Sequence, residues 1–335
     1  MSRSCVITTE EPNWWLTPPA EASCEDGGTE QEPSAERAND WDRKPVALVR
    51  FADSAGLADW VASLLLRDRL LRPQRPLGLA TGRTMEPVYA ALARQVNGLT
   101  PEERQELRRR WCSFNLDAYV GVDRADPRSF AAEMADRLTT PLGLDPERVH
   151  LPDGQAADPH AAAECYAAQL AATGGIGLQL LGLGLNGHVG FNEPPCEADA
   201  PCRCLKLSPA TRHQNAGAFG GDPEAVPQQA ITLGLREILA AERLLLVVTG
   251  AAKAEVLARA LREPPTPELP ASWIQLHPRA LVVADGAAAA LLDANRNPPT
   301  AARTASGVAG AGHAADPDLG ARRNPGLHAS SWPTR

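Results

Sequence analysis

Short apolar runs alternate with helical patterns through this chain, and this alternation constrains its fold more than any other feature. The runs at 77–80, 180–185 and 244–248 contain no polar side chain, which is typical of strands buried on both faces of a parallel sheet. Each run leads into a turn that contains glycine. Strands that alternate with helices over about 250 residues predict an α/β fold with helices on both faces of the sheet.

Two α/β architectures fit this length, a closed TIM barrel and an open sheet. The apolar runs are irregularly spaced and three strand ends carry glycine turns, which favours the open sheet. The turn Thr81–Thr84 reads Thr-Gly-Arg-Thr rather than Gly-x-Gly-x-x-Gly, so a dinucleotide fingerprint is absent. We predict an open, Rossmann-like, mostly parallel sheet within a single catalytic domain over residues 45–297.

The two ends of the chain differ from its middle in composition. Residues 1–44 are rich in Glu, Pro, Ser, Thr and Gly, and residues 298–335 are rich in Pro, Gly, Ala and Arg. Neither range has a periodic apolar pattern. Such segments cannot bury enough apolar surface to fold, so we predict a disordered N-terminal extension and a disordered C-terminal tail.

Charge, hydropathy and cysteine content exclude several classes of partner. The 335 residues carry a net charge of −8, so we expect no basic surface for nucleic acid or an anionic membrane. No apolar run approaches the roughly 18 residues of a membrane span, and the first residues lack the apolar core of a secretory signal. The cysteines number 7, which is odd, and they indicate reduced thiols in a cytoplasmic protein.

The segment Leu180–Pro194 is the first candidate for an active site. Its apolar first half ends in a turn that carries four polar side chains, Asn186, His188, Asn192 and Glu193. Ligands of open α/β sheets bind beyond the carboxyl ends of the strands, and a His and a Glu five residues apart suit proton transfer. Gly182 and Gly184 indicate a close approach of backbone or ligand. A surface loop with capping side chains is the alternative.

A second candidate is the turn Thr81–Thr84, which joins a predicted strand to a predicted helix. Free backbone N–H groups and the positive end of the helix would bind a phosphate there. The alternative, Thr84 as the N-cap residue of the helix, is compatible with that role. Lys253 lies in the first turn of a later helix, where its charge opposes the helix dipole. An anion bound at the same helix end would explain this placement.

Two further groups of residues have competing structural explanations. Asp117 follows the predicted strand at 111–116, and it either caps the turn or faces a ligand. The loop after Pro194 contains three cysteines, Cys196, Cys202 and Cys204. They could bind a metal, but their spacing matches no zinc motif and no fourth ligand is evident. We therefore expect no metal site.

Five segments of the chain resemble the glucosamine-6-phosphate deaminase family. They follow the family's order and read LGLATGRT at 77–84, FNLDAYVG at 114–121, GLNGHVGFNEP at 184–194, LVVTGAAK at 246–253 and PASWIQLH at 270–277. The resemblance covers residues 46–290, and the segment at 184–194 is the most specific. The related 6-phosphogluconolactonases share the fold and usually lack the Phe-Asn-Glu-Pro sequence.

This resemblance implies the conversion of glucosamine 6-phosphate to fructose 6-phosphate and ammonia. His188, oriented by Asn186 and Glu193 and titrating near neutral pH, would open the sugar ring. Asp117 matches the base that moves a proton between C2 and C1. The residues expected to bind the phosphate are Thr81, Gly82, Arg83, Thr84 and Lys253. The resemblance implies no metal and no cofactor, since the substrate's own carbonyl accepts the electrons, and it makes a homo-oligomer an expectation.

The chain departs from the family pattern at three positions. Asn186 stands where many members have Asp, and because it cannot accept a proton its implied role is to orient His188. Ala118 stands where members usually have Glu, which removes a charge beside Asp117. Gly217 stands where a phosphate-binding Arg is expected, and Arg83 and Arg212 are the candidates to replace that residue.

These departures leave other functions open. The substrate could be galactosamine 6-phosphate or another epimer. A lactonase acting on a sugar-acid phosphate is disfavoured by Asp117 and by the Phe-Asn-Glu-Pro turn. A non-catalytic regulator that binds a sugar phosphate is favoured by Ala118 and Gly217. A small phosphosugar is the expected ligand in every case.

Overall fold

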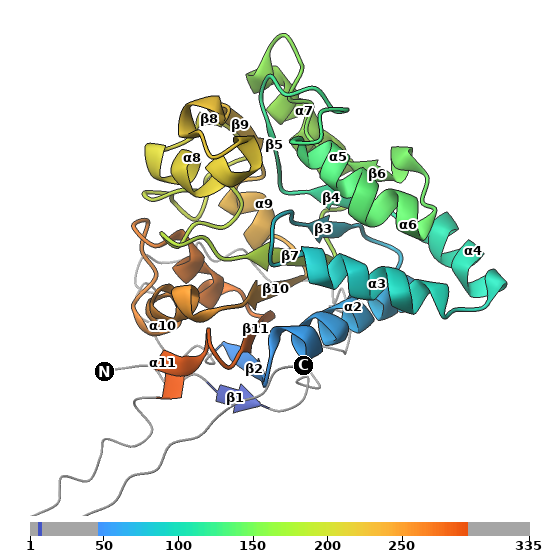
Figure 1. Ribbon diagram of the computed structural model, residues 1–335, viewed down its shortest axis with the longest axis horizontal. Helices are drawn as coiled ribbons and strands as arrows, with labels where there is room; N and C mark the ends of the chain where they lie inside the picture. The colour runs from blue at the N-terminus through green and yellow to red at the C-terminus, as the bar shows by residue number, and fades with distance from the viewer. Residues whose placement is uncertain (1–5, 9–45, 294–335) are drawn as a thin grey trace, which may run out of the picture. The chain divides into compact units, whose positions relative to one another are not determined.

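The computed structural model describes residues 6–8 and 46–293, which lie within one compact unit, Met1–Arg296 (Figure 1). The strands are β1 (Val6–Thr8), β2 (Ala47–Phe51), β3 (Leu77–Leu79), β4 (Ser113–Asn115), β5 (Asp117–Tyr119), β6 (Val149–His150), β7 (Leu178–Gly182), β8 (Arg203–Lys206), β9 (Gln229–Thr232), β10 (Arg243–Val248) and β11 (Ala280–Asp285). The α-helices are α2 (Ser54–Leu71), α3 (Glu86–Asn97), α4 (Pro101–Arg110), α5 (Phe130–Met134), α6 (Thr140–Leu142), α7 (Pro159–Ala172), α8 (Pro209–Asn215), α9 (Leu235–Leu239), α10 (Ala254–Arg262) and α11 (Ala290–Asp293). The shorter helical segments are the π-helix η1 (Ala135–Thr139) and the 3-10 helices η2 (Pro146–Arg148), η3 (Ala216–Phe219), η4 (Pro223–Ala225), η5 (Ala251–Lys253) and η6 (Pro270–Leu276).

Most of the two predicted tails, 1–44 and 298–335, lies outside the described residues. The exception is β1, which pairs in parallel with β2. All three residues of β1 are β-branched, and such residues favour a strand where a sheet edge offers unpaired backbone groups. The disorder of the two tails stays a prediction.

Eight strands form one sheet in the order β1-β2-β11-β10-β7-β3-β4-β6, and every neighbouring pair is parallel. The open, mostly parallel sheet predicted from the sequence is confirmed. The barrel alternative is excluded, because β1 and β6 end the sheet and do not pair with each other. Every residue of β10 and β11 is buried, as the absence of polar alternation in their sequences predicts.

The order in which the chain adds strands to the sheet changes direction between β3 and β7. From β3 it proceeds outward to β4 and β6, and it then returns to pair β7 with the opposite edge of β3. From β7 it continues outward to β10 and β11. The connections after β3 and β7 therefore leave the sheet in opposite directions. Open α/β sheets bind ligands at such a switch point, beyond the carboxyl ends of the strands.

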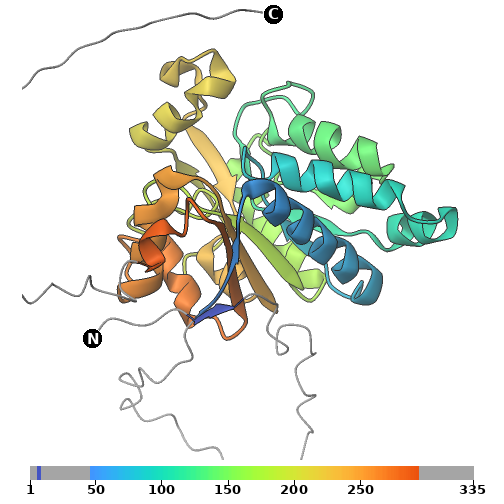
Figure 2. The same ribbon diagram turned by 60° about the horizontal axis from the view of Figure 1, so that its bottom comes forward.

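Helices cover both faces of the parallel sheet. Helices α2 and α3 pack against each other, and α2 also contacts β2 and β11. Figure 2 shows these two helices on one side of the sheet and α10 with α11 on the other. Helices α2 and α7 begin after Asp53 and Asp158, whose side chains accept backbone N–H groups of the first turn. None of the helices in the described ranges is long and apolar enough to cross a bilayer.

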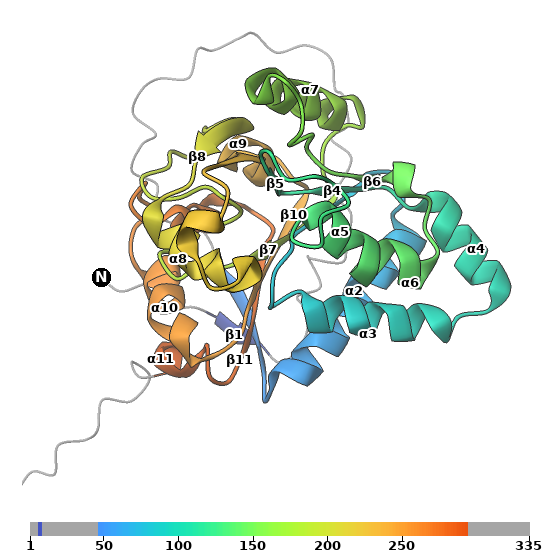
Figure 3. The ribbon, with the colours of Figure 1, turned by 45° about the horizontal axis from the view of Figure 1, so that its top comes forward.

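A second, three-stranded sheet was not predicted. It has the order β5-β9-β8, and both pairs are antiparallel (Figure 3). Its strand β5 follows β4 after one residue, so the chain passes directly from the large sheet into the small one. An aromatic cluster packs beside this sheet, in which the rings of Phe130, Phe191 and Phe219 lie 4.7–5.5 Å from the ring of Tyr119. This cluster joins α5, the turn after β7 and η3.

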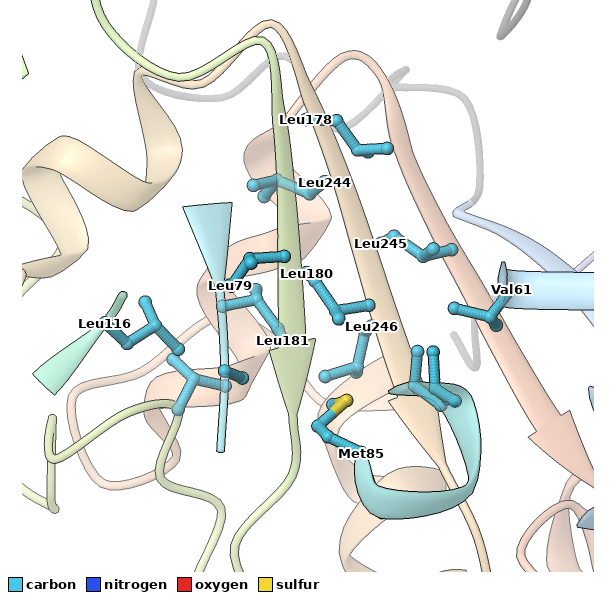
Figure 4. Packing of buried hydrophobic residues seen from close by; sticks show 14 of the residues in the cluster. Val61, Leu79, Met85, Leu116, Leu178, Leu180, Leu181, Leu244, Leu245 and Leu246 are labelled. Atoms are coloured by element: carbon cyan, nitrogen blue, oxygen red, sulfur yellow. The ribbon is translucent and has the colours of Figure 1, made fainter. Parts of the chain in front are cut away.

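The core beneath the switch point is made of large apolar side chains from several elements. Figure 4 shows Met85 and Leu180 on one side of β7 and Leu181 on the other, all of them within the same buried cluster. Met85 follows the turn at 81–84 directly and is 0% exposed. Burial of this side chain holds the turn against the ends of the strands.

Candidate active site

The turn after β7 holds His188 through Asn186. The Oδ1 atom of Asn186 accepts the backbone N–H of His188 at 3.2 Å and lies 2.6 Å from Nδ1 of the same residue. An amide oxygen only accepts hydrogen bonds, so Nδ1 carries the proton and Nε2 presents a free lone pair. The structure thus brings together two of the residues singled out in the sequence.

His188 is a neutral base in this environment. Burial lowers the pKa of His188 to about 4, against the opposing effect of the Glu193 carboxylate and together with the charge of Lys253. The expectation that this imidazole titrates near neutral pH is therefore wrong. An aspartate at position 186 would favour the imidazolium ion, whereas Asn186 offers only an uncharged oxygen.

Gly184 is required by the imidazole ring. A methyl group on Gly184 would lie 2.3 Å from both Nδ1 and Cε1 of His188. The ring therefore lies directly on the backbone of Gly184. The sequence predicts that backbone or a ligand approaches Gly184 closely, and in the structure the imidazole ring of His188 does so.

Glu193 is placed differently from the expectation. Its carboxylate accepts the backbone N–H of Ser208 at 2.8 Å, the hydroxyl of Ser208 at 2.5 Å and the hydroxyl of Thr211. These are the N-cap residue and the first turn of α8. Within the described residues its hydrogen bonds thus anchor α8, and Glu193 acts on His188 through its charge rather than through a hydrogen bond.

Asp117 is the first residue of β5 and its side chain is enclosed. Only 7% of the residue is exposed. A methyl group on Gly190, whose φ of +58° suits glycine, would lie 3.3 Å from Oδ2 of Asp117 and 3.1 Å from Oγ1 of Thr232. The turn that carries His188 therefore passes directly over this carboxyl group.

The environment of Asp117 favours its protonated form. Burial raises the pKa of Asp117 from 3.8 to about 7, and the negative charge of Glu133 adds to the rise. A carboxyl group with a pKa near the working pH can both take and return a proton. Asp117 lies at the end of the ladder between β5 and β9, where it pairs with Thr232, and this position disfavours the alternative of an ordinary turn cap.

The turn at 81–84 connects β3 to α3 and presents hydroxyl groups. Gly82 has a φ of +101°, and its carbonyl accepts the backbone N–H of Met85 at 2.8 Å. The N-cap position of α3 is Met85. Thr84 is therefore not the N-cap, and its hydroxyl lies instead 3.5 Å from the hydroxyl of Thr249. Two hydroxyl groups that follow β3 and β10 in the chain therefore meet here.

Two cations accompany these hydroxyl groups. Lys253 ends the 3-10 segment η5 and is half-buried. Burial and, after it, the neighbouring charge of Arg83 together lower the pKa of Lys253 to about 8. Two cations that repel each other at one place gain free energy when an anion binds between them.

Arg212 is engaged elsewhere. Its guanidinium donates to the carbonyl of Val226 and pairs with Glu224 at 3.1 Å. Gly217 lies in η3, and a methyl group added to it would meet nothing within 4 Å. Of the two candidates to replace the expected arginine at 217, the structure therefore favours Arg83 over Arg212.

Two residues near the site were missed by sequence reasoning. Glu133 from α5 accepts the backbone N–H of Gly82 at 3.0 Å and acts on Asp117 through its charge. Thr249 supplies the hydroxyl opposite Thr84. Thr249 could have been found, since it follows an apolar strand as the other site residues do. No sequence signal marks Glu133, because its partners lie in other elements.

The three cysteines of the loop after Pro194 are free thiols. Cys196, Cys202 and Cys204 are buried, and burial raises the pKa of each. Across residues 6–8 and 46–293 no group of three His, Cys, Asp or Glu side chains is placed to share a metal ion. The expectation of a reaction without metal or cofactor stays a prediction.

Comparison with known proteins places this geometry in a family context. The model of a family described as glucosamine-6-phosphate isomerases/6-phosphogluconolactonase matches residues 54–283. A glucosamine-6-phosphate deaminase of Rhodopirellula baltica is 43% identical over 233 residues, which are 70% of this chain and 90% of the relative. A deaminase of the same description from Streptomyces coelicolor is 41% identical over 249 residues, 74% of this chain and 92% of the relative.

Solved structures show the same fold. A monomeric glucosamine-6-phosphate deaminase superposes with a TM-score of 0.68 at 32% identity, covering 73% of this chain and 99% of that protein. A 6-phosphogluconolactonase from Trypanosoma brucei superposes with a TM-score of 0.57 at 18% identity, covering 75% of this chain and 99% of that protein. At this lower identity the likeness is one of fold alone.

Proposed function

Because this chain belongs to the family of glucosamine-6-phosphate isomerases and 6-phosphogluconolactonases, we propose that it converts glucosamine 6-phosphate and water to fructose 6-phosphate and ammonia. The observation that carries the proposal is the enclosed carboxyl group of Asp117, whose pKa is raised to about 7 by burial. The reaction needs one group that removes a proton from carbon and returns it to the neighbouring carbon. A lactonase needs no such group.

The ring of the substrate opens first. Nε2 of His188 accepts the proton of the anomeric hydroxyl group and returns it to the ring oxygen, which breaks the bond between C1 and that oxygen. A neutral imidazole suits this task because it begins as an acceptor and ends as one. Asn186 keeps the proton on Nδ1 throughout, so that Nε2 remains the reacting atom.

Asp117 carries the next step. Its carboxylate removes the proton from C2 of the open aminoaldehyde, and the electron pair moves to the C1 oxygen, which takes a proton from the substrate's own ammonium group to form an enolamine. The same carboxyl group returns its proton to C1, which leaves an iminium group at C2. Water adds to that group, and ammonia leaves as an ammonium ion when the C2 ketone forms. Each proton that Asp117 takes it also returns, so a pKa near neutrality serves both directions.

The phosphate fixes C1 and C2 against these groups. We assign it to the turn that contains Thr81, Gly82, Arg83 and Thr84, through the hydroxyl groups of the two threonines and the charge of Arg83, together with the charge of Lys253. The N–H group of Gly82 is itself donated to Glu133. The convergence of the hydroxyl groups and charges at the switch point between β3 and β7 supports this assignment. A cytoplasmic location and a homo-oligomer stay predictions.

Ammonia release from purified protein tests this function. Glucosamine 6-phosphate and galactosamine 6-phosphate are supplied in parallel, with the Asp117→Asn variant as the control. Turnover of the first substrate, with a kcat at least about a hundredfold lower in the variant, is the expected result. Turnover of galactosamine 6-phosphate alone would change the substrate and keep the mechanism. Binding of both sugars without ammonia would replace the proposal with a non-catalytic regulator.

A further inference from the structure

Glu133 connects two parts of the site that are distant in sequence. Its Oε1 atom accepts the backbone N–H of Gly82 at 3.0 Å, across 51 positions of the chain. The side chain is 20% exposed, so this bond forms in a largely desolvated setting. Charge-assisted bonds of this kind are stronger than those between neutral groups. The conformation of the turn at 81–84 therefore depends on α5.

The same carboxylate acts on Asp117. Glu133 is the one charged group that contributes to the raised pKa of Asp117, after burial itself. The neighbour of Asp117 along β5 is Ala118, which has no charge to contribute. A like charge supplied by a different element thus adds to the effect of burial on the protonation of the proposed base.

Burial raises the pKa of Glu133 and the charge of Glu86 adds to the rise, whereas the Gly82 N–H group and Arg137 favour the charged form. The nearest cation is Arg137 on η1, whose Nε lies 3.9 Å from Glu133 but whose Nη2 lies closer, at 3.1 Å, to Glu86 on α3. Two tyrosines complete the set of titratable groups that face it, Tyr89 on α3 and Tyr119 on β5, and the pKa of each is raised by burial. Arg137 is shared between two carboxylates and neutralises neither fully.

We propose that Glu133 is a positioning residue of this site, which fixes the Gly82 turn through the amide hydrogen bond and presents a negative charge to Asp117. The inference rests on the proposed function, since it gives the turn and the base their roles. It predicts two separable effects. The hydrogen bond controls phosphate binding, and the charge controls the pH at which Asp117 becomes a base.

Three variants separate these effects. Glu133→Gln keeps an oxygen acceptor for Gly82 and removes the charge. Glu133→Asp keeps the charge and shortens the side chain, so the bond to Gly82 is lost. Glu86→Gln is the matched control, because it removes a carboxylate from the same Arg137 and touches neither Gly82 nor Asp117.

The pH profile of kcat/KM measures the effect of the Glu133 charge on the pKa of Asp117. Asp117 must lose its proton to act, so activity falls as the pH drops through its pKa. In Glu133→Gln the like charge is gone, and the acidic limb is expected to move to lower pH by about 0.5 to 1 unit. In Glu133→Asp and Glu86→Gln the limb is expected to stay within about 0.3 unit of the wild type. A merely structural role for Glu133 would not produce this difference.

The affinity for phosphate measures the effect of the hydrogen bond between Gly82 and Glu133. Calorimetric titration with inorganic phosphate is expected to give a dissociation constant about three- to tenfold higher for Glu133→Asp than for the wild type. Glu133→Gln is expected to bind phosphate at least as tightly as the wild type. Equal phosphate affinity in Glu133→Asp and the wild type would overturn the role of the Gly82 bond.

The carboxyl titration of Asp117, followed by carbon-13 resonance in the wild type and in Glu133→Gln, needs no turnover. An unchanged titration, or an equal shift in Glu86→Gln, would overturn the role of the charge. If the wild type releases no ammonia, the proposed function fails while this titration and the phosphate measurement still test Glu133. The two failures are therefore distinguishable.

Discussion

A single methyl group added at Gly184 is expected to disable His188 without unfolding the protein. In Gly184→Ala the new carbon would lie 2.3 Å from both Nδ1 and Cε1 of the imidazole ring. This is about 1.2 Å closer than carbon atoms in van der Waals contact, which lie about 3.5 Å apart. The ring must move away by about that distance, because the backbone of the turn is held by the bond from the Gly184 N–H to the His188 carbonyl.

The displacement can be converted to a rate. Moving Nδ1 by about 1 Å breaks its 2.6 Å bond to Asn186, and the tautomer is no longer fixed. Misplacing a reacting group by about 1 Å costs about a hundredfold in rate. We therefore expect kcat for ammonia release to fall about a hundredfold or more. KM should change less than about threefold, because the phosphate-binding turn at 81–84 is not touched.

Gly182→Ala is the matched control for this variant. It adds the same methyl group two residues earlier, where the new carbon would meet only Cε of Met85 at 3.6 Å, an ordinary contact. Its kcat is expected to stay within about twofold of the wild type, and thermal unfolding checks that both variants are folded. A kcat for Gly184→Ala within about threefold of the wild type would refute the steric argument and the role of His188 together.

Three further predictions test the site. Asp117→Asn should gain stability relative to the wild type as the pH rises. Because the folded-state pKa of Asp117 is raised from 3.8 to about 7, the stability that this group contributes is full below pH 3.8 and is lost as the pH rises through about 7. In denaturant titrations the free energy of unfolding of the variant, relative to the wild type, should therefore grow by about 2 to 3 kcal/mol between pH 5 and 8, and a constant difference would contradict the shift. Arg83→Gln should raise KM about tenfold, because the charge of Arg83 lies near Lys253. Arg212→Gln should raise KM by less than about twofold, because Arg212 is paired with Glu224. A larger rise in Arg212→Gln than in Arg83→Gln would assign phosphate binding to Arg212 instead. Gly217→Arg should lower KM about three- to tenfold, because the position is open and the family expects an arginine there, and an unchanged KM would show that Arg83 already serves the phosphate fully.

Sequence reasoning found the site residues whose positions are determined by the end of a strand. Asn186 and His188 lie two residues apart in one turn, so their contact is local. Thr84 and Lys253 follow different strands, β3 and β10, yet they could be assigned to one site in advance, because the carboxyl ends of parallel strands lie at one edge of the sheet. The alternation of apolar runs was enough to predict that edge.

The parts that sequence reasoning missed are set by tertiary contacts. Glu193 was expected at His188, but its hydrogen-bond partners lie 15 and 18 positions later at the start of α8. Asp117–Tyr119 looks like a turn in sequence and becomes a strand only because β9 pairs with it. The pKa of His188 depends on how deeply the ring is enclosed. None of these properties follows from spacing along the chain.

Burial is the largest cause of the resting charge state of the proposed catalytic groups. It raises the pKa of Asp117 and lowers the pKa values of His188 and Lys253, so every shift is toward the uncharged form. The empty site thereby avoids the cost of isolated buried charges. A phosphosugar brings its own charges, an anion for Arg83 and Lys253 and an ammonium group for the carboxylates. Binding therefore supplies the counter-charges that the protein withholds, and Asp117 should ionise more readily in the complex than in the free protein.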